Sequence, residues 1–247
     1  MRFSIITITY NAEKYIEETL SSVSSQSFFD YEHILWDGGS TDKTLEIARR
    51  FPHISIFQGK DSGISDAMNQ GASLAKGDFL IHLHADDIFS HADTLKMIDE
   101  ALNSSPEARW GYGRASIINE VGAFIRTNSL EIFSSKRLRR YNFITHPAVF
   151  ISRELFFEMN GFNPHLLYCM DYDLWLRLSL HTSPLVLSAV LSCFRVHSQS
   201  LSTKEQLGVA NEAYKVRNCY ARSVWERWKS YRTWKKRINR IVGINHS

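Results

Sequence analysis

The chain has 247 residues, of which 44% are hydrophobic and 22% are charged, and this suits one large domain, or one domain with an appendage, that buries a sizeable core. A formal net charge of +3 argues against a general nucleic-acid-binding role, and three cysteines without metal-like spacing indicate reduced thiols. The sequence shows neither a secretory signal nor an apolar run of the roughly 18 residues that span a bilayer, so we expect a cytoplasmic protein.

Strands and helices alternate through the first hundred residues. Short apolar, β-branched runs predict strands, and apolar residues at helical spacing predict helices between them. Alternation of this kind predicts an α/β, Rossmann-like fold with a mostly parallel sheet and helices on both faces. The expected strands cover 3–9, 32–36, 54–58 and 78–83, and helices follow Asn11 and cover 41–51, 64–75 and about 93–102.

The second half of the chain is more mixed. A hairpin is expected over 114–126 around the turn 119–122, and further strands and helices alternate up to residue 194. From 204 to 241 the pattern is helical. We therefore predict a domain over 1–200, made of halves 1–105 and 106–200, followed by a helical extension over 201–247.

Polar clusters follow three of the expected strands. They are the segments 9–11, 37–40 and 84–87, which read TYN, DGGS and HADD. In parallel α/β sheets, ligands bind beyond the carboxyl ends of the strands. We therefore expect the three clusters to gather along one edge of the sheet.

Two adjacent carboxylates, Asp86 and Asp87, follow a strand that should be buried. Neighbouring carboxylates repel one another unless a cation neutralises them, and a divalent ion that also contacts a diphosphate would do so. The alternative is a helix N-cap, because acidic residues favour helix starts. The shared edge with two other polar clusters favours the metal.

Three further polar residues are candidates for donor binding. Asp37 could accept hydrogen bonds from a base or ribose, or it could simply belong to a strand-to-helix turn. Asp66 and Asn69 are three residues apart, hence on one helix face, and could reach a donor. The alternative for the segment around Asp66 and Asn69 is that Asp61 or Ser62 simply caps the helix expected over 64–75.

Five segments in order resemble the large family-2 group of inverting glycosyltransferases with the GT-A fold. They read SIITITYN, WDGGSTDKT, DSGISDAMNQGA, KGDFLIHLHADD and YCMDYDLWLRL, and the resemblance covers roughly residues 3–200. It implies transfer of a sugar from a nucleotide-diphosphate donor, most often a UDP-sugar, with Mg²⁺ or Mn²⁺. The implied acceptor is a lipid-linked or growing glycan of bacterial polysaccharide biosynthesis.

The resemblance also implies roles for individual residues. Asp86 takes the place of the metal-binding carboxylate, and His197 resembles a histidine near the metal or diphosphate. The nucleoside is held by Thr9, Tyr10, Asn11 and Asp37.

Two positions depart from the family pattern. His84 stands where the family often has the first aspartate of D-x-D. An imidazole at this position can still bind a metal or a phosphate, together with Asp87. Gly38 stands where many members have a second aspartate that contacts the base of a uridine nucleotide.

An inverting transfer needs a base that deprotonates the acceptor hydroxyl, and it needs positive charge on the departing diphosphate. The resemblance assigns the base to Asp171, just before the helix expected over 172–180, where an N-cap is the alternative. His146 could line the acceptor side, and Arg195 could meet phosphate. Packing or surface roles are the alternatives for both.

The end of the chain is basic and aromatic. Nine basic residues lie between Arg217 and Arg240, and Trp225, Trp228, Tyr231 and Trp234 recur at three-residue steps. Such a helix could lie on an anionic membrane surface, making the protein peripheral, or the stripe could pack on the domain.

The residues are also compatible with two other functions. One is a catalytically silent nucleotide-sugar-binding module that associates with membranes through the basic tail. The other is a sugar nucleotidyltransferase, which is disfavoured because the first strand is followed by TYNA rather than by a glycine-rich basic loop. A nucleic-acid partner is not expected, and the sequence does not indicate an oligomeric state.

Overall fold

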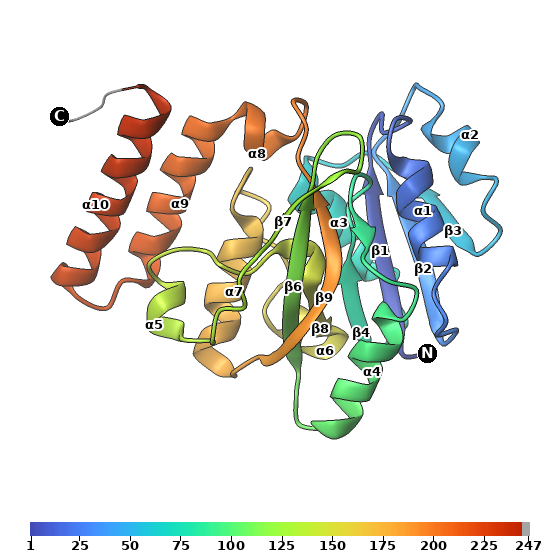
Figure 1. Ribbon diagram of the computed structural model, residues 1–247, viewed down its shortest axis with the longest axis horizontal. Helices are drawn as coiled ribbons and strands as arrows, with labels where there is room; N and C mark the ends of the chain where they lie inside the picture. Colours follow the sequence, from blue (N-terminus) through green and yellow to red (C-terminus); the bar gives the residue numbers. More distant parts are fainter. Residues whose placement is uncertain (244–247) are drawn as a thin grey trace.

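The computed structural model describes residues 1–243, so the last four residues of the predicted extension lie outside it. A nine-stranded sheet crosses the molecule in the order β3-β2-β1-β4-β8-β6-β9-β5, with β7 paired to β6 (Figure 1). The strands are β1 (Phe3–Thr9), β2 (Tyr31–Asp37), β3 (Ile54–Gln58), β4 (Phe79–His82), β5 (Ile88–Phe89), β6 (Trp110–Ile118), β7 (Phe124–Thr127), β8 (Val149–Ser152) and β9 (Leu185–Arg195).

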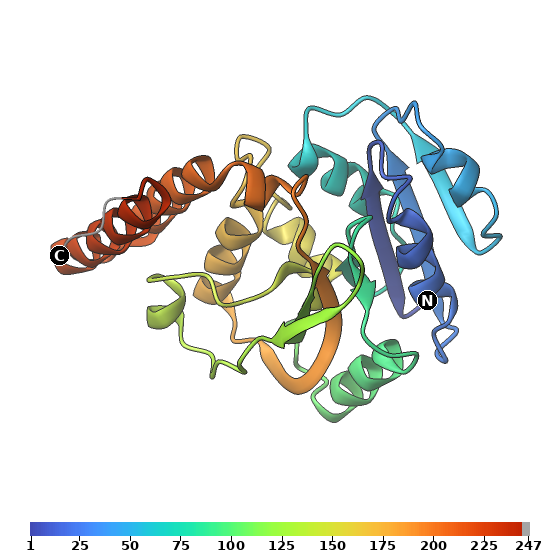
Figure 2. The ribbon, with the colours of Figure 1, turned by 45° about the horizontal axis from the view of Figure 1, so that its top comes forward.

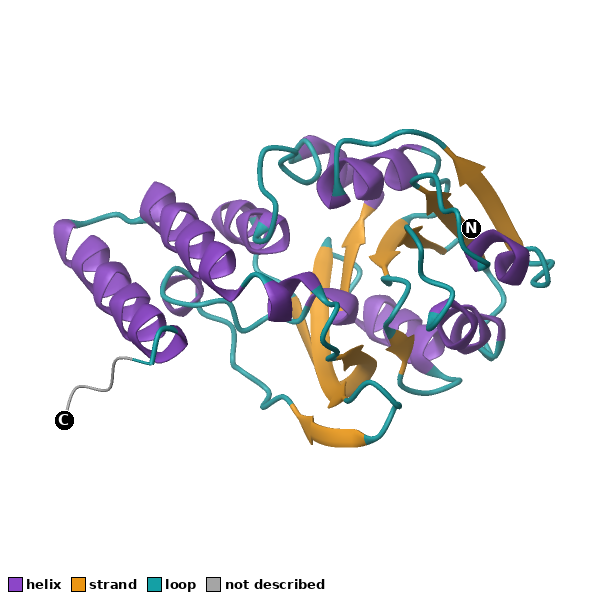
Figure 3. Ribbon diagram, turned by 90° about the horizontal axis from the view of Figure 1, so that it is seen from above, coloured by secondary structure: helices purple, strands orange, loops and turns teal. Residues whose placement is uncertain are grey.

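The first half of the sheet is parallel, as the alternating pattern predicts. β1 pairs in parallel with β2 and β4, and β2 pairs in parallel with β3. Alternate residues of β1 enter two cores, because successive side chains of a strand point to opposite faces. Ile6 packs with α3 (Ile64–Ser73), and Phe3 and Ile5 pack with α1 (Ile16–Ser24) and α4 (Thr94–Ser104). Figure 3 shows helices on both sides of the sheet.

The second half of the sheet is mixed. β8 is antiparallel to both β4 and β6, the predicted hairpin forms between β6 and β7, and β9 runs parallel to β6. The two-residue β5, antiparallel to β9, is too short to be predicted from its sequence. The remaining elements are α2 (Thr44–Ala48), α5 (Ser135–Leu138), the 3-10 turn η1 (His146–Ala148), α6 (Arg153–Glu158), α7 (Met170–His181), α8 (Leu201–Lys204), α9 (Gln206–Tyr220) and α10 (Val224–Ile241).

Among the differences from the sequence-based expectation, three concern residues near the predicted site. Asn11 does not cap α1: it has φ 51° and accepts a hydrogen bond from the Thr41 N–H at 2.8 Å. α2 is shorter than the expected helix 41–51, because the Asp42 carboxylate binds the N–H groups of Glu13 and Thr44 and delays the helix start. α7 begins at Met170, so Asp171 lies in its first turn.

The predicted helical extension is a helical hairpin. α9 and α10 pack against one another, and the chain reverses between them at 221–223, where the Ser223 hydroxyl accepts from the Glu226 N–H. Figure 2 shows the hairpin projecting from the end of the molecule, and Figure 1 shows that α9 lies nearer to α7 than α10 does. The division at residue 200 stays a prediction. None of the helices within residues 1–243 is both long and apolar enough to cross a membrane.

Candidate active site

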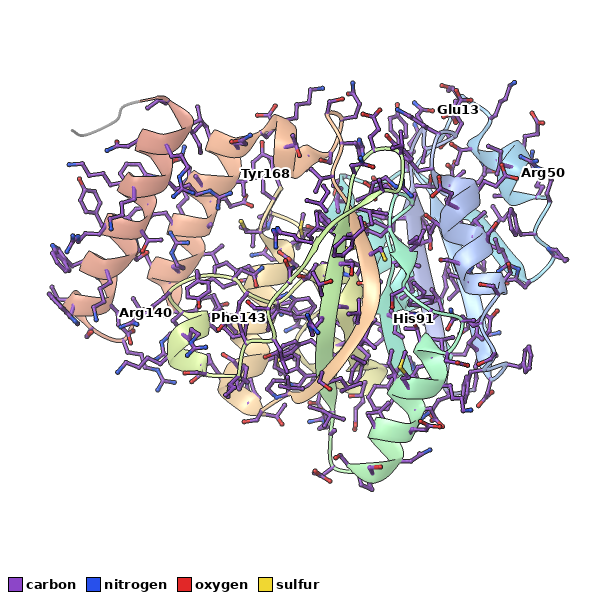
Figure 4. All side chains as sticks on the ribbon, in the orientation of Figure 1. Glu13, Arg50, His91, Arg140, Phe143 and Tyr168 are labelled. Carbon is purple, nitrogen blue, oxygen red and sulfur yellow. The ribbon has the colours of Figure 1, made fainter. Side chains whose placement is uncertain are left out.

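A cavity of about 850 Å³ lies beyond the carboxyl ends of β1 and β4. Figure 4 labels Glu13 and Tyr168, two of its lining residues, at the same upper edge of the molecule. Two of the three polar clusters expected at this edge line the cavity, and the cluster 37–40 does not. The walls come from residues 8–15, Asp42, Asp61, 63–64, 67–68, 84–87, 146–147, 167–168, 170–171, Phe194, His197, 199–201 and Val209.

An acidic cluster forms one wall. Ligand atoms of His84, Asp86 and Asp87 lie within 4.8 Å of one another. His197, in the loop after β9, brings its Nε2 to 2.9 Å from Oδ2 of Asp86, although the two residues are 111 positions apart in the sequence. The ring of Tyr15 covers His197 at 4.8 Å between ring centroids. The fold thus joins the ends of β4 and β9 at this cluster.

Arg195 is fully buried beneath the acidic cluster and does not line the cavity. Its backbone N–H donates to Oδ1 of Asp87 at 3.0 Å, and its Nε donates to the Asp86 carbonyl at 3.0 Å. Its guanidinium also binds Glu18 at 2.5 Å and the Glu120 carbonyl at 3.2 Å. The hydrogen bonds of the Arg195 side chain thus hold the turn that carries Asp86, and the phosphate contact expected for Arg195 stays a prediction.

The electrostatics of the cluster favour a bound cation. Burial and the neighbouring charge of Asp86 raise the pKa of Asp87 well above its ordinary value. Burial is the largest influence on Asp86 and opposes its ionisation, but the hydrogen bond with His197 and the charges of the neighbouring histidines together lower the pKa of Asp86. Burial also lowers the pKa of His84, which keeps its imidazole neutral near pH 7.

The residues present suit a divalent ion. Oδ2 of Asp87 is buried without a hydrogen-bond partner, beside the carboxylate of Asp86 and the neutral ring of His84. Carboxylate oxygens are the ligands that Mg²⁺ prefers, and imidazole is also acceptable to Mn²⁺. A cation here would relieve both the repulsion between the two aspartates and the unpaired oxygen.

Asp171 lines another part of the cavity wall. Its Oδ1 accepts from the Tyr172 N–H at 2.6 Å and its Oδ2 from the Asn142 amide at 3.4 Å. Burial raises the pKa of Asp171 to about 6, although these two hydrogen bonds lower it. The carboxylate therefore changes charge in the range where a general base works best.

His146 also lines the cavity, as expected for the acceptor side. Its Nε2 is buried without a partner, and its ring lies 4.7 Å from the ring of His84. Burial lowers its pKa well below the ordinary value, so the ring is neutral.

Another part of the cavity wall is formed by the end of β1 and the polar residues after it. Thr9, Tyr10 and Asn11 all line the cavity, and the Thr9 hydroxyl is buried without a hydrogen-bond partner. Asp61 lines the cavity beside them: its Oδ2 would lie 2.8 Å from a Cβ added at Gly38. Sequence reasoning treated Asp61 only as a cap. The signal that points to it is Gly38, which leaves room for a carboxylate from another segment.

Besides Arg195, three predicted donor-binding residues do not line the cavity. Asp37 is fully buried, and its carboxylate accepts from the N–H groups of Gly39 and Ser40 and from the Ser40 hydroxyl. The predicted contact with a base or ribose is therefore replaced by support of its own turn, which was the alternative reading.

Asp66 and Asn69 are likewise engaged within the protein. Asp66 accepts from the N–H and the hydroxyl of Ser62. Asn69 exchanges two hydrogen bonds with the backbone of Phe162, at 2.8 and 2.9 Å. They share a helix face as expected, but that face is turned to neighbouring loops and not to the cavity.

Comparisons with known proteins agree with this geometry. Residues 4–157 match the family described as Glycosyl transferase family 2. A PGL/p-HBAD biosynthesis glycosyltransferase of Mycobacterium tuberculosis is 35% identical over 184 residues, which cover 71% of this chain and 68% of the relative. An uncharacterized glycosyltransferase of the same organism is 31% identical over 198 residues, which cover 77% and 74% of the two chains.

Solved structures share the fold. TarS of S. aureus, residues 1–349 in complex with UDP-GlcNAc, has a TM-score of 0.68 at 20% identity and covers 99% of this chain and 74% of its own. The mannosyltransferase PcManGT of Pyrobaculum calidifontis, in complex with GDP-Man and Mn²⁺, has a TM-score of 0.69 at 15% identity and covers 100% and 76%. The predicted α/β fold of the GT-A type is confirmed. The chain belongs to glycosyl transferase family 2.

Proposed function

We propose that this glycosyltransferase moves a sugar from a UDP-sugar to an acceptor hydroxyl, with inversion at the anomeric carbon. The observation that carries the proposal is that the acidic cluster around Asp86 and the carboxylate of Asp171 line one cavity. The complexes of TarS with UDP-GlcNAc and of PcManGT with GDP-Man and Mn²⁺ support a nucleotide-sugar donor and a divalent ion.

The nucleoside is assigned to the wall after β1. The unpartnered Thr9 hydroxyl is available to a ribose or base, with Tyr10 and Asn11 beside it. Asp61 is assigned to the base, because it fills the space that the missing side chain of Gly38 leaves. The indole N–H of Trp36 donates to its carboxylate at 3.2 Å and holds it in that place.

The diphosphate is assigned to the acidic cluster. Mg²⁺ or Mn²⁺ would be held by Asp86 and Asp87, with His84 beside them and His197 orienting Asp86. When bound, the ion supplies positive charge to the departing diphosphate. Arg195 fixes this turn from below and contributes to the site only through Asp86 and Asp87.

Transfer then proceeds as one displacement. Asp171 accepts the proton of the acceptor hydroxyl, and the acceptor oxygen forms its bond to the anomeric carbon. The bond from that carbon to the diphosphate oxygen breaks, and the nucleoside diphosphate leaves with the electron pair. Asp171 can serve because it ends the step as a neutral carboxylic acid, which its buried position tolerates.

The proposal is tested by thermal-shift measurements with UDP, GDP, dTDP and CMP, each with and without Mn²⁺. Binding to the folded state at a hundredfold excess over Kd should raise the Tm by about 5–10 °C. We expect the largest Mn²⁺-dependent shift with UDP, and hydrolysis or transfer with a UDP-sugar. If no nucleotide raises the Tm and no nucleotide sugar is consumed, the proposed function is wrong.

We further propose a lipid-linked or growing glycan acceptor and a peripheral position on the inner face of the plasma membrane. In α10, Trp225 and Trp228 stack at 4.6 Å and stay 57% and 42% exposed, with Lys229 and Arg232 over their rings. Trp234 instead packs on α9 and donates to Asn211. The first half of the aromatic stripe therefore remains available to an anionic lipid surface.

Replacing Trp225 and Trp228 together with serine should weaken binding to phosphatidylglycerol vesicles by about tenfold or more, because two indoles no longer enter the interface. Vesicle co-sedimentation measures this. Phe29→Ser is the control, since Phe29 is 84% exposed near the opposite end of the fold. Equal binding by the double variant and the control would contradict the membrane assignment.

A further inference from the structure

Glu212 of α9 binds the loop that leads into α7. Its carboxylate accepts three backbone hydrogen bonds, from the N–H groups of Leu167 at 3.0 Å, Tyr168 at 2.7 Å and Cys169 at 2.7 Å. Leu167 and Tyr168 line the cavity, and Cys169 comes two residues before Asp171. A side chain of the C-terminal extension therefore sets the backbone immediately before the proposed base.

The chemistry of this contact is favourable at this end of a helix. The first N–H groups of a helix have no partner within the helix, and the helix dipole places partial positive charge there. A carboxylate that accepts several N–H bonds near this end forms charge-assisted hydrogen bonds with them. Glu212 thus binds the N–H of the N-cap residue Cys169 and those of the two residues before it, Leu167 and Tyr168.

α9 fits this loop in a second way. Gly208 lies one turn before Glu212, and a Cβ added there would stand 2.7 Å from the ring of Tyr168. The thiol of Cys169 approaches the Val209 carbonyl at 3.7 Å. Any larger residue at position 208 would push the Tyr168 ring, and with it the loop, away from α9.

α9 also holds α7 on the other side of the base. The Tyr220 hydroxyl donates to Oδ1 of Asp173 at 2.8 Å, and Arg177 donates to Oδ2 of Asp173 at 2.8 Å. α9 therefore makes hydrogen bonds to residues 167–169 and to residue 173, which lie on either side of Asp171 in the chain. Figure 1 shows α9 alongside α7.

The titratable groups at this end of α7 come from several elements. Glu212 and Arg217 stand on α9 and Arg237 on α10, while Cys169 and Tyr172 flank Asp171 itself. The neutral amide of Asn142 faces Asp171 from the loop before η1. After burial, the negative charge of Glu212 is a further cause that raises the pKa of Asp171.

We propose that Glu212 is a positioning residue of the transfer reaction: by binding loop 167–169 it sets the place and the surroundings of the Asp171 carboxylate. The inference rests on the proposed function of Asp171 as the base. It makes the helical extension a part of the active site, because α9 supplies both the carboxylate and the surface on which the loop rests.

The test is the pH dependence of kcat and kcat/KM for Glu212→Gln, with Glu205→Gln as the matched control. Both changes remove one charge from the start or body of α9, but Glu205 is exposed and the three N–H groups of loop 167–169 bind Glu212. We expect Glu212→Gln to lower kcat by about 10- to 100-fold with donor KM within about twofold, because the base is misplaced. Its acid limb should move to lower pH, and Glu205→Gln should match the wild type.

Glu212→Asp keeps the charge and is the control for a loss of activity caused by a folding defect. It should retain the wild-type acid limb with a smaller loss of kcat. A Glu212→Gln acid limb that coincides with the wild type would overturn the inference, because a merely structural residue changes the amount of active enzyme and not its titration. Retained transfer by Asp171→Asn would instead show that the proposed base is wrong, whatever Glu212 does.

Discussion

Replacing Asp86 with asparagine is expected to lower kcat by about 10³-fold and to remove the Mn²⁺ dependence of nucleotide binding. Asp86 is the carboxylate of the cluster that faces the cavity with an ionised side chain, because the hydrogen bond with His197 lowers its pKa. Asparagine keeps the shape but removes the charge that holds the ion. Steady-state rates and calorimetric titration of UDP with and without Mn²⁺ measure both effects.

The control is Asp78→Asn. Asp78 is exposed and comes immediately before β4, at the opposite end of the strand that leads to Asp86. The control should bind UDP and Mn²⁺ as the wild type does. Unchanged Mn²⁺-dependent binding by Asp86→Asn would show that the acidic cluster does not hold the ion.

Replacing Asp171 with asparagine is expected to lower kcat by about 10²- to 10⁴-fold while the affinity for UDP and Mn²⁺ stays the same. An amide cannot accept the acceptor proton, but it can still fill the space between Tyr172 and Asn142. The same rate assay and the same nucleotide titration separate the two effects. The Asp78→Asn protein again serves as the reference.

The pH dependence of kcat in the wild-type enzyme is expected to follow the ionisation of Asp171. A base must be ionised to accept a proton, and burial raises the pKa of Asp171 to about 6. Protonation therefore removes the base as the pH falls through about 6, and kcat should fall tenfold per pH unit below that point. If Asp171→Asn kept both the rate and this acid limb, the base would have to be sought among the other cavity-lining groups, beginning with His146.

The order of strands and helices, and the edge of the sheet where the site lies, can be predicted from the amino-acid sequence alone. Local apolar periodicity sets the elements, and a parallel sheet has one carboxyl edge, so the segments 9–11 and 84–87 had to meet there. The helix that carries Asp171 could also be predicted from local apolar periodicity. These features depend on neighbouring residues and on topology rules.

Only the tertiary structure decided which polar side chains face the cavity. Asp37, Asp66 and Asn69 satisfy nearby backbone groups, whereas Asp61 turns toward the cavity beside Gly38. A carboxylate binds whichever donors the folded chain presents, and a local pattern does not contain donors that lie far along the chain.

The contacts that complete the proposed site join residues that lie far apart in the chain. His197 reaches Asp86 across 111 residues, and Glu212 reaches Cys169 across 43. Both pairs form because separate elements pack side by side, β9 beside the acidic turn and α9 beside α7. Their partners could not be read from either segment alone, because packing and not periodicity brings them together.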